Sequence, residues 1–226
     1  LVLLFLLLFS AQILGQGLQF KFNQDINVSN GKGILKNPWA GGLNAVQFAQ
    51  IDLNGDGIED VLAFDRTNQK VFTYVNKSIL GGAISLVYDP IYEKYFPFIE
   101  NWLIVSDFDG DKRKDLFTST SAGVKVYRNI SVGSNIKFEV VSEALFSEGF
   151  SGKINVYVAA SDIPAIGDLD GDGDIDILSF EPGGHYLEFH KNMSVEKTGQ
   201  MGLQFQKVGD CWGNFILHYL QLNIIT

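Results

Sequence analysis

The feature that most constrains this chain is a nine-residue acidic segment that occurs three times. The copies are DLNGDGIED at 52–60, DFDGDKRKD at 107–115 and DLDGDGDID at 168–176, and their first residues lie 55 and 61 positions apart. In every copy an oxygen-bearing side chain occupies positions 1, 3, 5 and 9. A spacing that is kept in three copies predicts a repeat architecture, in which each copy does the same structural work.

The three segments also concentrate the charge of the chain. The sequence has 26 Asp and Glu residues against 17 Lys and Arg, a formal net charge of −9. Half of the acidic residues fall within the segments, together with only three basic ones, Lys112, Arg113 and Lys114. Like charges crowded into a short loop repel one another unless a cation lies among them. The pattern indicates a metal site and argues against a nucleic-acid partner.

Each acidic segment is followed by the pattern of a β-hairpin. The expected strands lie at 61–64 and 71–75, at 116–118 and 124–127, and at 177–180 and 186–189, with further strands at 137–141 and 204–208. An Asn follows each hairpin, at offsets of 24, 22 and 24 from the first Asp: Asn76, Asn129 and Asn192. A unit of this length with room for about four strands has the size of a propeller blade. The predicted fold class is therefore all-β.

Alternating oxygen atoms in a tight loop suit Ca²⁺, which takes six to eight hard oxygen ligands. Residues 1, 3, 5 and 9 of each segment would bind through side chains, and residue 7 through its backbone carbonyl. The predicted Ca²⁺ ligands are Asp52, Asn54, Asp56, Ile58, Asp60, Asp107, Asp109, Asp111, Arg113, Asp115, Asp168, Asp170, Asp172, Asp174 and Asp176. An EF-hand needs a bidentate Glu at position 12, where this chain has Ala63, Thr118 and Ser179. The loops are thus expected between strands.

A hairpin turn that binds no metal is the alternative for any single loop, since Asn-Gly and Asp-Gly are strong turn signals. Three copies with one spacing favour calcium. The middle loop carries Lys112 where the other two carry Gly57 and Gly173. A positive φ at that residue would strain the backbone by roughly 1 kcal/mol, so the middle loop is expected to lose its ion first.

The acidic segments and their flanking strands resemble the FG-GAP/VCBS repeat family over roughly residues 40–195. Repeats of that family form the calcium-loop blades of integrin α-subunit propellers and of many bacterial exported proteins. The resemblance implies a β-propeller, usually with seven blades, of which about three are visible in this chain, with Ca²⁺ as a structural ion in loops between strands. It also implies a role in adhesion or recognition.

The two ends of the chain lack the repeat pattern. Residues 1–9, LVLLFLLLF, are too short to span a bilayer comfortably and predict a signal peptide over 1–15, its start possibly missing, with a buried strand or membrane anchor as the alternative. The repeats are expected over 16–210, followed by an irregular or truncated tail at 211–226. The single Cys211 excludes an intrachain disulfide. Calcium would replace disulfides as the staple of an exported domain.

The predicted function is that of a secreted or cell-surface calcium-binding module for an extracellular protein or carbohydrate ligand, with no nucleic-acid partner and no stable membrane span after signal cleavage. The alternative is a non-catalytic propeller scaffold attached to a missing enzyme domain that acts on extracellular polysaccharide or lipid. No nucleotide-binding or hydrolase motif occurs, so no catalytic residue is predicted. A glycosidase would require acidic residues such as Glu100, Glu143 or Glu181 to converge in one cleft.

Two further features allow two interpretations each. The aromatic stretch 88–102 suits either a partner-binding surface or packing between blades, and packing is slightly favoured. The sequons at Asn27, Asn76, Asn129 and Asn192 could accept glycans. Three of them occupy the equivalent repeat position, so a structural role in a turn at the end of the blade is favoured over glycosylation.

Overall fold

The computed structural model describes residues 20–21, 23–79, 83–218 and 221–224, so the predicted signal peptide at 1–15 lies outside the described residues. The chain divides into two compact units, Leu1–Trp39 and Ala40–Thr226. In the described part of the first unit, an isolated antiparallel bridge joins Ser29 to Ile34. The Trp39 indole donates a hydrogen bond to the Ile26 carbonyl at 3.0 Å.

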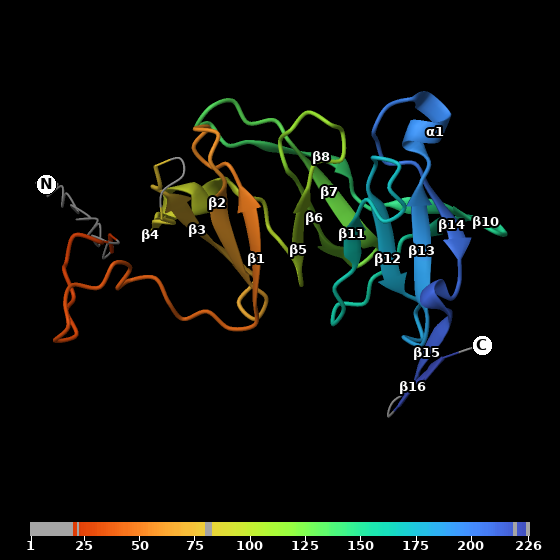
Figure 1. Cartoon of the computed structure of the whole chain (residues 1–226), viewed down its shortest axis with the longest axis horizontal. Coiled ribbons are helices and arrows are strands. Elements are labelled where there is room, and N and C mark those ends of the chain that lie inside the picture. The colour runs from red at the N-terminus through yellow and green to blue at the C-terminus, as the bar shows by residue number, and fades with distance from the viewer. Residues whose placement is uncertain (1–19, 22, 80–82, 219–220, 225–226) are drawn as a thin grey trace, which may run out of the picture. The chain divides into compact units, whose positions relative to one another are not determined.

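Three antiparallel sheets form most of the second unit (Figure 1). In each, four strands pair in an unbroken row, and we call these rows blades 1, 2 and 3. Blade 1 contains β1 (Val46–Ile51), β2 (Asp60–Asp65), β3 (Lys70–Asn76) and β4 (Leu86–Tyr88). Blade 2 contains β5 (Leu103–Ser106), β6 (Asp115–Thr120), β7 (Gly123–Asn129) and β8 (Phe138–Ser142). Blade 3 contains β11 (Ala165–Gly167), β12 (Asp176–Phe180), β13 (Leu187–Asn192) and β14 (Phe205–Gly209).

The strand sequences explain these blades. Strand β3 alternates in burial, with Val71, Thr73 and Val75 buried and the residues between them half-buried, as expected for a pleated strand with two unlike faces. Strands β2 and β6 lie inside their sheets and are buried on both faces, which accounts for their unbroken apolar runs. The all-β prediction is confirmed, and the strands after each acidic segment form where they were expected.

A hairpin inserted between blades 2 and 3 was not predicted. Strands β9 (Phe146–Gly149) and β10 (Gly152–Asn155) pair antiparallel, and β9 also pairs in parallel with β14. They extend the sheet of blade 3 to six strands. Near the C-terminus, β15 (Phe215–His218) and β16 (Gln221–Ile224) form a separate two-stranded sheet within the 211–226 segment.

The described helices are short. They are the 3-10 helix η1 (Pro90–Tyr95), α1 (Ser194–Thr198) and the 3-10 helix η2 (Trp212–Asn214). The Asp89 side chain caps η1 by accepting from the Ile91 amide at 3.2 Å. Within the described ranges, no helix combines the length and the apolar character that crossing a membrane requires.

Two hydrophobic clusters join neighbouring blades. One contains Leu62 and Phe64 of blade 1 with Leu103, Leu116 and Tyr127 of blade 2. The other contains Phe117, Val124 and Val126 of blade 2 with Ile177 and Phe205 of blade 3. Apolar burial is the main stabilising contribution in such packing, at about 25 cal/mol per Å². The blades are therefore held face to face by side chains on β2, β3 and their counterparts.

The aromatic stretch 88–102 serves both predicted purposes. Trp102 is fully buried in the cluster between blades 2 and 3, and Tyr92 and Phe96 pack against the cluster between blades 1 and 2. Tyr95 and Phe98 are 41% and 70% exposed. The stretch thus contributes mostly to packing, while two of its aromatic side chains face solvent.

Candidate metal-binding loops

Each acidic segment connects the first and second strands of one blade. Loop 1 (52–60) follows β1, loop 2 (107–115) follows β5 and loop 3 (168–176) follows β11, and in each case residue 9 of the loop is the first residue of the next strand. The repeat in sequence is thus a repeat in space, with one loop at the same place in every blade. The predicted setting between strands is confirmed.

The first Asp of each loop holds the turn through two backbone N–H groups. In loop 2, Asp107 Oδ1 accepts from Gly110 at 2.7 Å and Oδ2 accepts from Lys112 at 2.8 Å. Asp52 and Asp168 make the same two contacts in their loops, at 2.7 to 3.2 Å. Position 1 therefore needs a two-oxygen acceptor, which Asp provides and Asn does not.

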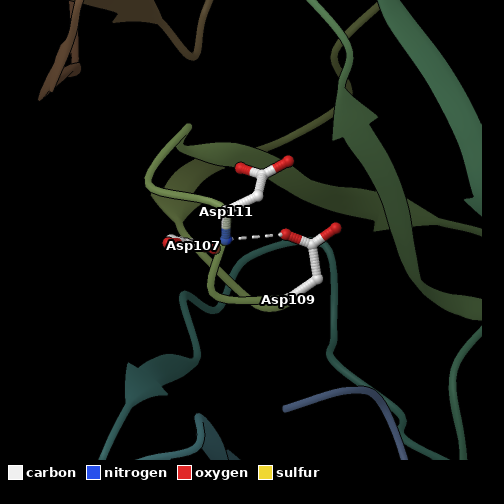
Figure 2. A group of neighbouring side chains, drawn as sticks. All are labelled: Asp107, Asp109 and Asp111. Atoms are coloured by element: carbon white, nitrogen blue, oxygen red, sulfur yellow. Dashed lines mark hydrogen bonds between the residues drawn. The ribbon is translucent and has the colours of Figure 1, made fainter. Parts of the chain in front are cut away.

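Positions 3 and 5 continue the pattern along the loop. Asp109 Oδ1 accepts from the Asp111 amide at 3.3 Å (Figure 2), and Asp111 Oδ1 accepts from the Arg113 amide at 2.8 Å. Loops 1 and 3 repeat these bonds at 2.8 to 3.3 Å. Each side chain uses one oxygen for the backbone, so the loop is folded by the same residues that would bind a cation.

Position 9 is different because its carboxylate is buried. Asp60, Asp115 and Asp176 are all fully buried. Asp115 Oδ2 accepts from the Phe108 amide at 3.0 Å and Oδ1 from the Asn129 amide at 2.7 Å, and the other two loops repeat both bonds. Burial raises the pKa of Asp115 to about 7, although these two hydrogen bonds oppose the shift, and it raises the pKa of Asp60 and Asp176 as well.

The repeated Asn closes each loop from the far end of the hairpin. Asn76, Asn129 and Asn192 donate through Nδ2 to the carbonyl at loop position 8, at 3.0 to 3.2 Å. Their Oδ1 atoms accept from the amide of the sequon Ser two residues later, at 3.0 to 3.1 Å. Asn129 and Asn192 are also buried. These contacts support the predicted structural role, since the amide nitrogen that a glycan would occupy is already bonded inside the blade.

The acidic side chains converge in two loops. In loop 2, one oxygen from each of Asp107, Asp109 and Asp111 lies within 4.8 Å of the others (Figure 2), and in loop 3 the same holds for Asp168, Asp170 and Asp176. Loop 1 carries Asn54 at position 3 and forms no such carboxylate triplet among the described residues. The donors in all three loops are oxygens, which fits a hard divalent cation.

Residue 7 varies among the loops. Ile58 is half-buried, and Arg113 is exposed and donates from Nε to the Asn129 carbonyl at 2.9 Å. Asp174 is fully buried, its Oδ2 accepts from the Val195 amide at 3.1 Å, and its Oδ1 has no hydrogen-bond partner among the described residues. Burial raises the pKa of Asp174 to about 6. A buried carboxylate oxygen without a partner beside an acidic loop is a feature that a bound cation would stabilise.

Sequence reasoning missed the basic side chains beside the loops. Arg128 Nε lies 2.6 Å from Asp109 Oδ2. Lys191 contacts Asp170, Asp172 and Glu196, and these contacts raise its pKa. Both residues directly precede the repeated Asn, and blade 1 has Val75 at that position. The signal was therefore present, one residue before Asn129 and Asn192. In loops 2 and 3, a metal ion and a basic side chain would compete for the same carboxylates.

Residue 6 of the middle loop adopts the predicted strained conformation. Lys112 has φ 70°, close to the 79° and 98° of Gly57 and Gly173. We expect Lys112→Gly to raise the free energy of unfolding by about 1 kcal/mol, because glycine adopts this region without steric cost. Urea unfolding would measure it. Lys112→Ala removes the charge but keeps Cβ, so an equal gain in that control would show that charge and not φ is responsible.

Comparison with protein families places the repeat. Residues 107–179 match the family model of the FG-GAP-like repeat. The match begins at the first Asp of loop 2 and ends within β12, so it spans blade 2, the β9–β10 hairpin and loop 3. The resemblance seen in the sequence is confirmed for this FG-GAP-like stretch. No curated protein and no solved structure matched the chain.

The FG-GAP-like repeat is consistent with the propeller-type blades observed in the second unit. Loop 1 precedes the matched residues, yet its hydrogen bonds are those of loops 2 and 3 at positions 1, 3, 5 and 9. Blade 1 thus repeats the structural unit of the FG-GAP-like stretch, which indicates a binding or adhesion type of module.

Proposed function

We propose that this chain is a secreted or cell-surface module that binds Ca²⁺ in its three acidic loops and uses its blades to bind an extracellular protein or carbohydrate. The observation that carries the proposal is the common scaffold of the loops. In all three, the same positions accept the same backbone amides and leave further side-chain oxygens at the turn. Such a scaffold orders the ligands before the ion arrives, which lowers the entropy cost of binding.

Calcium fits these loops better than magnesium. Ca²⁺ accepts six to eight oxygens in flexible geometry, whereas Mg²⁺ requires near-ideal octahedral geometry and gives up its waters reluctantly. Each loop offers side-chain oxygens at positions 1, 3, 5 and 9 and a carbonyl at position 7. When bound, the ion would neutralise the clustered carboxylates and stabilise the blade. We therefore assign it a structural role.

A binding role suits the remaining surface. Tyr95 and Phe98 are exposed beside η1, and aromatic side chains of this kind are common contacts for sugars and protein partners. The acidic residues outside the loops have local partners: Glu143 lies 2.8 Å from Lys125, and Glu181 accepts the His185 amide at 2.9 Å. A module without catalytic residues is the function that these contacts support.

Equilibrium dialysis against Ca²⁺ tests the metal sites. We expect one ion per loop in the full chain, and one ion fewer in Asp168→Ala, because position 1 of loop 3 loses its carboxylate. Loop 2, with its strained Lys112 and its Arg128 contact, should lose its ion first as the concentration falls. Asp210→Ala removes an exposed Asp outside the loops and should leave the count unchanged. A parent chain that binds no calcium would refute the proposal.

A further inference from the structure

The strand register makes residues of the three blades equivalent, and this defines two sides of every blade. The leading flank of blade 2 consists of Leu103, Leu116 and Tyr127, which pack against blade 1. Its counterparts, by pairing with the strand that follows the loop, are Phe48, Val61 and Tyr74 in blade 1 and Pro164, Ile177 and His190 in blade 3. The trailing flank consists of Leu53, Leu62 and Val71 in blade 1, Phe108, Phe117 and Val124 in blade 2, and Leu169, Leu178 and Leu187 in blade 3.

Leading flanks are covered wherever a blade precedes them. Leu103, Leu116 and Tyr127 are 3%, 0% and 8% exposed under blade 1. The corresponding residues of blade 3 are all buried. In blade 1 the same position is open: Phe48 is 70% exposed, and Val61 and Tyr74 are only half-buried. A hollow of about 720 Å³ beside this flank is lined in part by Phe48, Gln50 and Val61.

Trailing flanks show the opposite asymmetry. Leu53 of blade 1 and Phe108 of blade 2 are buried under the next blade, yet their counterpart in blade 3, Leu169, is 40% exposed. Leu187 is half-buried where Val71 and Val124 are buried. The second unit therefore ends in two apolar surfaces of different kinds, one at blade 1 and one at blade 3.

We propose that the trailing flank of blade 3 packs onto the leading flank of blade 1 in a second copy of this chain. The two open flanks are the two halves of an interface that the chain already forms twice, between blades 1 and 2 and between blades 2 and 3. Each flank fits the other kind and not itself, so the contact is heterologous, with copies joined head to tail. The association extends the established blade packing from one chain into the next.

Light scattering of the purified full chain in saturating Ca²⁺ tests this contact. The mass should rise above the 25.0 kDa of one chain as concentration increases. Phe48→Lys and Leu169→Lys should each lower the mass at high concentration, since a buried lysine without a partner opposes packing. Both residues are exposed in the single chain, so circular dichroism should show intact folding. Phe150→Lys, at an equally exposed Phe in the β9–β10 turn, is the matched control and should assemble like the parent.

Mixing the two variants is the decisive arm. The Phe48→Lys chain keeps its blade 3 flank and the Leu169→Lys chain keeps its blade 1 flank, so together they form one intact contact and then stop. An equimolar mixture should contain a complex of two chains that neither variant forms alone. Nonspecific aggregation would not follow this rule. A parent chain that stays single at every concentration, or a mixture that stays single, would overturn the proposal.

Discussion

Calcium should raise the melting temperature of the full chain by about 10 °C relative to the same chain in chelator. An ion that binds only the native state stabilises it by RT ln(1 + [L]/Kd), which is about 1.4 kcal/mol per loop at a tenfold excess over Kd. Three loops then contribute about 4 kcal/mol, and a chain of this size gains roughly 2 to 4 °C per kcal/mol. The shift is large because three separate sites act on the same folded unit.

The physical cause is the charge that the loops concentrate. Without an ion, each loop brings several carboxylates together at its turn, one of them fully buried. Arg128 and Lys191 offset part of this repulsion in loops 2 and 3, whereas Asp52 and Asp56 of loop 1 have no basic ion-pair partner among the described side chains. Loop 1 should therefore gain the most from calcium.

Differential scanning calorimetry at 10 mM Ca²⁺, at 10 mM Mg²⁺ and in chelator would measure the effect. Magnesium is the matched control because it has the same charge but requires a smaller and more rigid site. Calcium should shift the transition well beyond magnesium. Equal shifts in the two salts would indicate general screening of charge, and no shift in either would mean that the acidic segments are ordinary turns.

The loops and their hairpins could be predicted because their signals are local. Alternation in 71–75 and the apolar run at 61–64 are the patterns of β3 and β2, and the Asp spacing specifies the turn between β1 and β2. Even the positive φ of Lys112 followed from comparison with Gly57 and Gly173. Repetition strengthened each inference, since one pattern was read three times.

Long-range pairing could not be predicted in the same way. The parallel contact between β9 and β14 joins residues almost 60 positions apart, and nothing in either segment specifies the other. Lys191 reaches loop 3 from β13 only because the hairpin folds back beside the loop. The different exposure of Phe48 and Leu103 likewise follows from the order of the blades and not from the two sequences.

Asp115→Ala should lower the free energy of unfolding on the order of 4 kcal/mol in saturating Ca²⁺. The substitution leaves the amides of Phe108 and Asn129 without their acceptor, at a cost of about 1 to 3 kcal/mol for each buried group, and it also removes a predicted ligand. In chelator the loss should fall to about 2 kcal/mol. The buried charge whose pKa is raised to about 7 is then removed as well, and this relieves part of the cost.

Asp109→Ala is the informative comparison, because position 3 accepts only one amide, at 3.3 Å, and is not fully buried. Its loss should cost about 1 kcal/mol in Ca²⁺, the contribution of one ion. In chelator it should cost almost nothing, since removing one carboxylate also relieves repulsion from Asp107 and Asp111. Urea unfolding of both variants with and without calcium separates the two roles. If Asp109→Ala were as costly in chelator as Asp115→Ala, position 9 would have no special part in holding the blade. If neither cost depended on calcium, the loops would be purely structural turns.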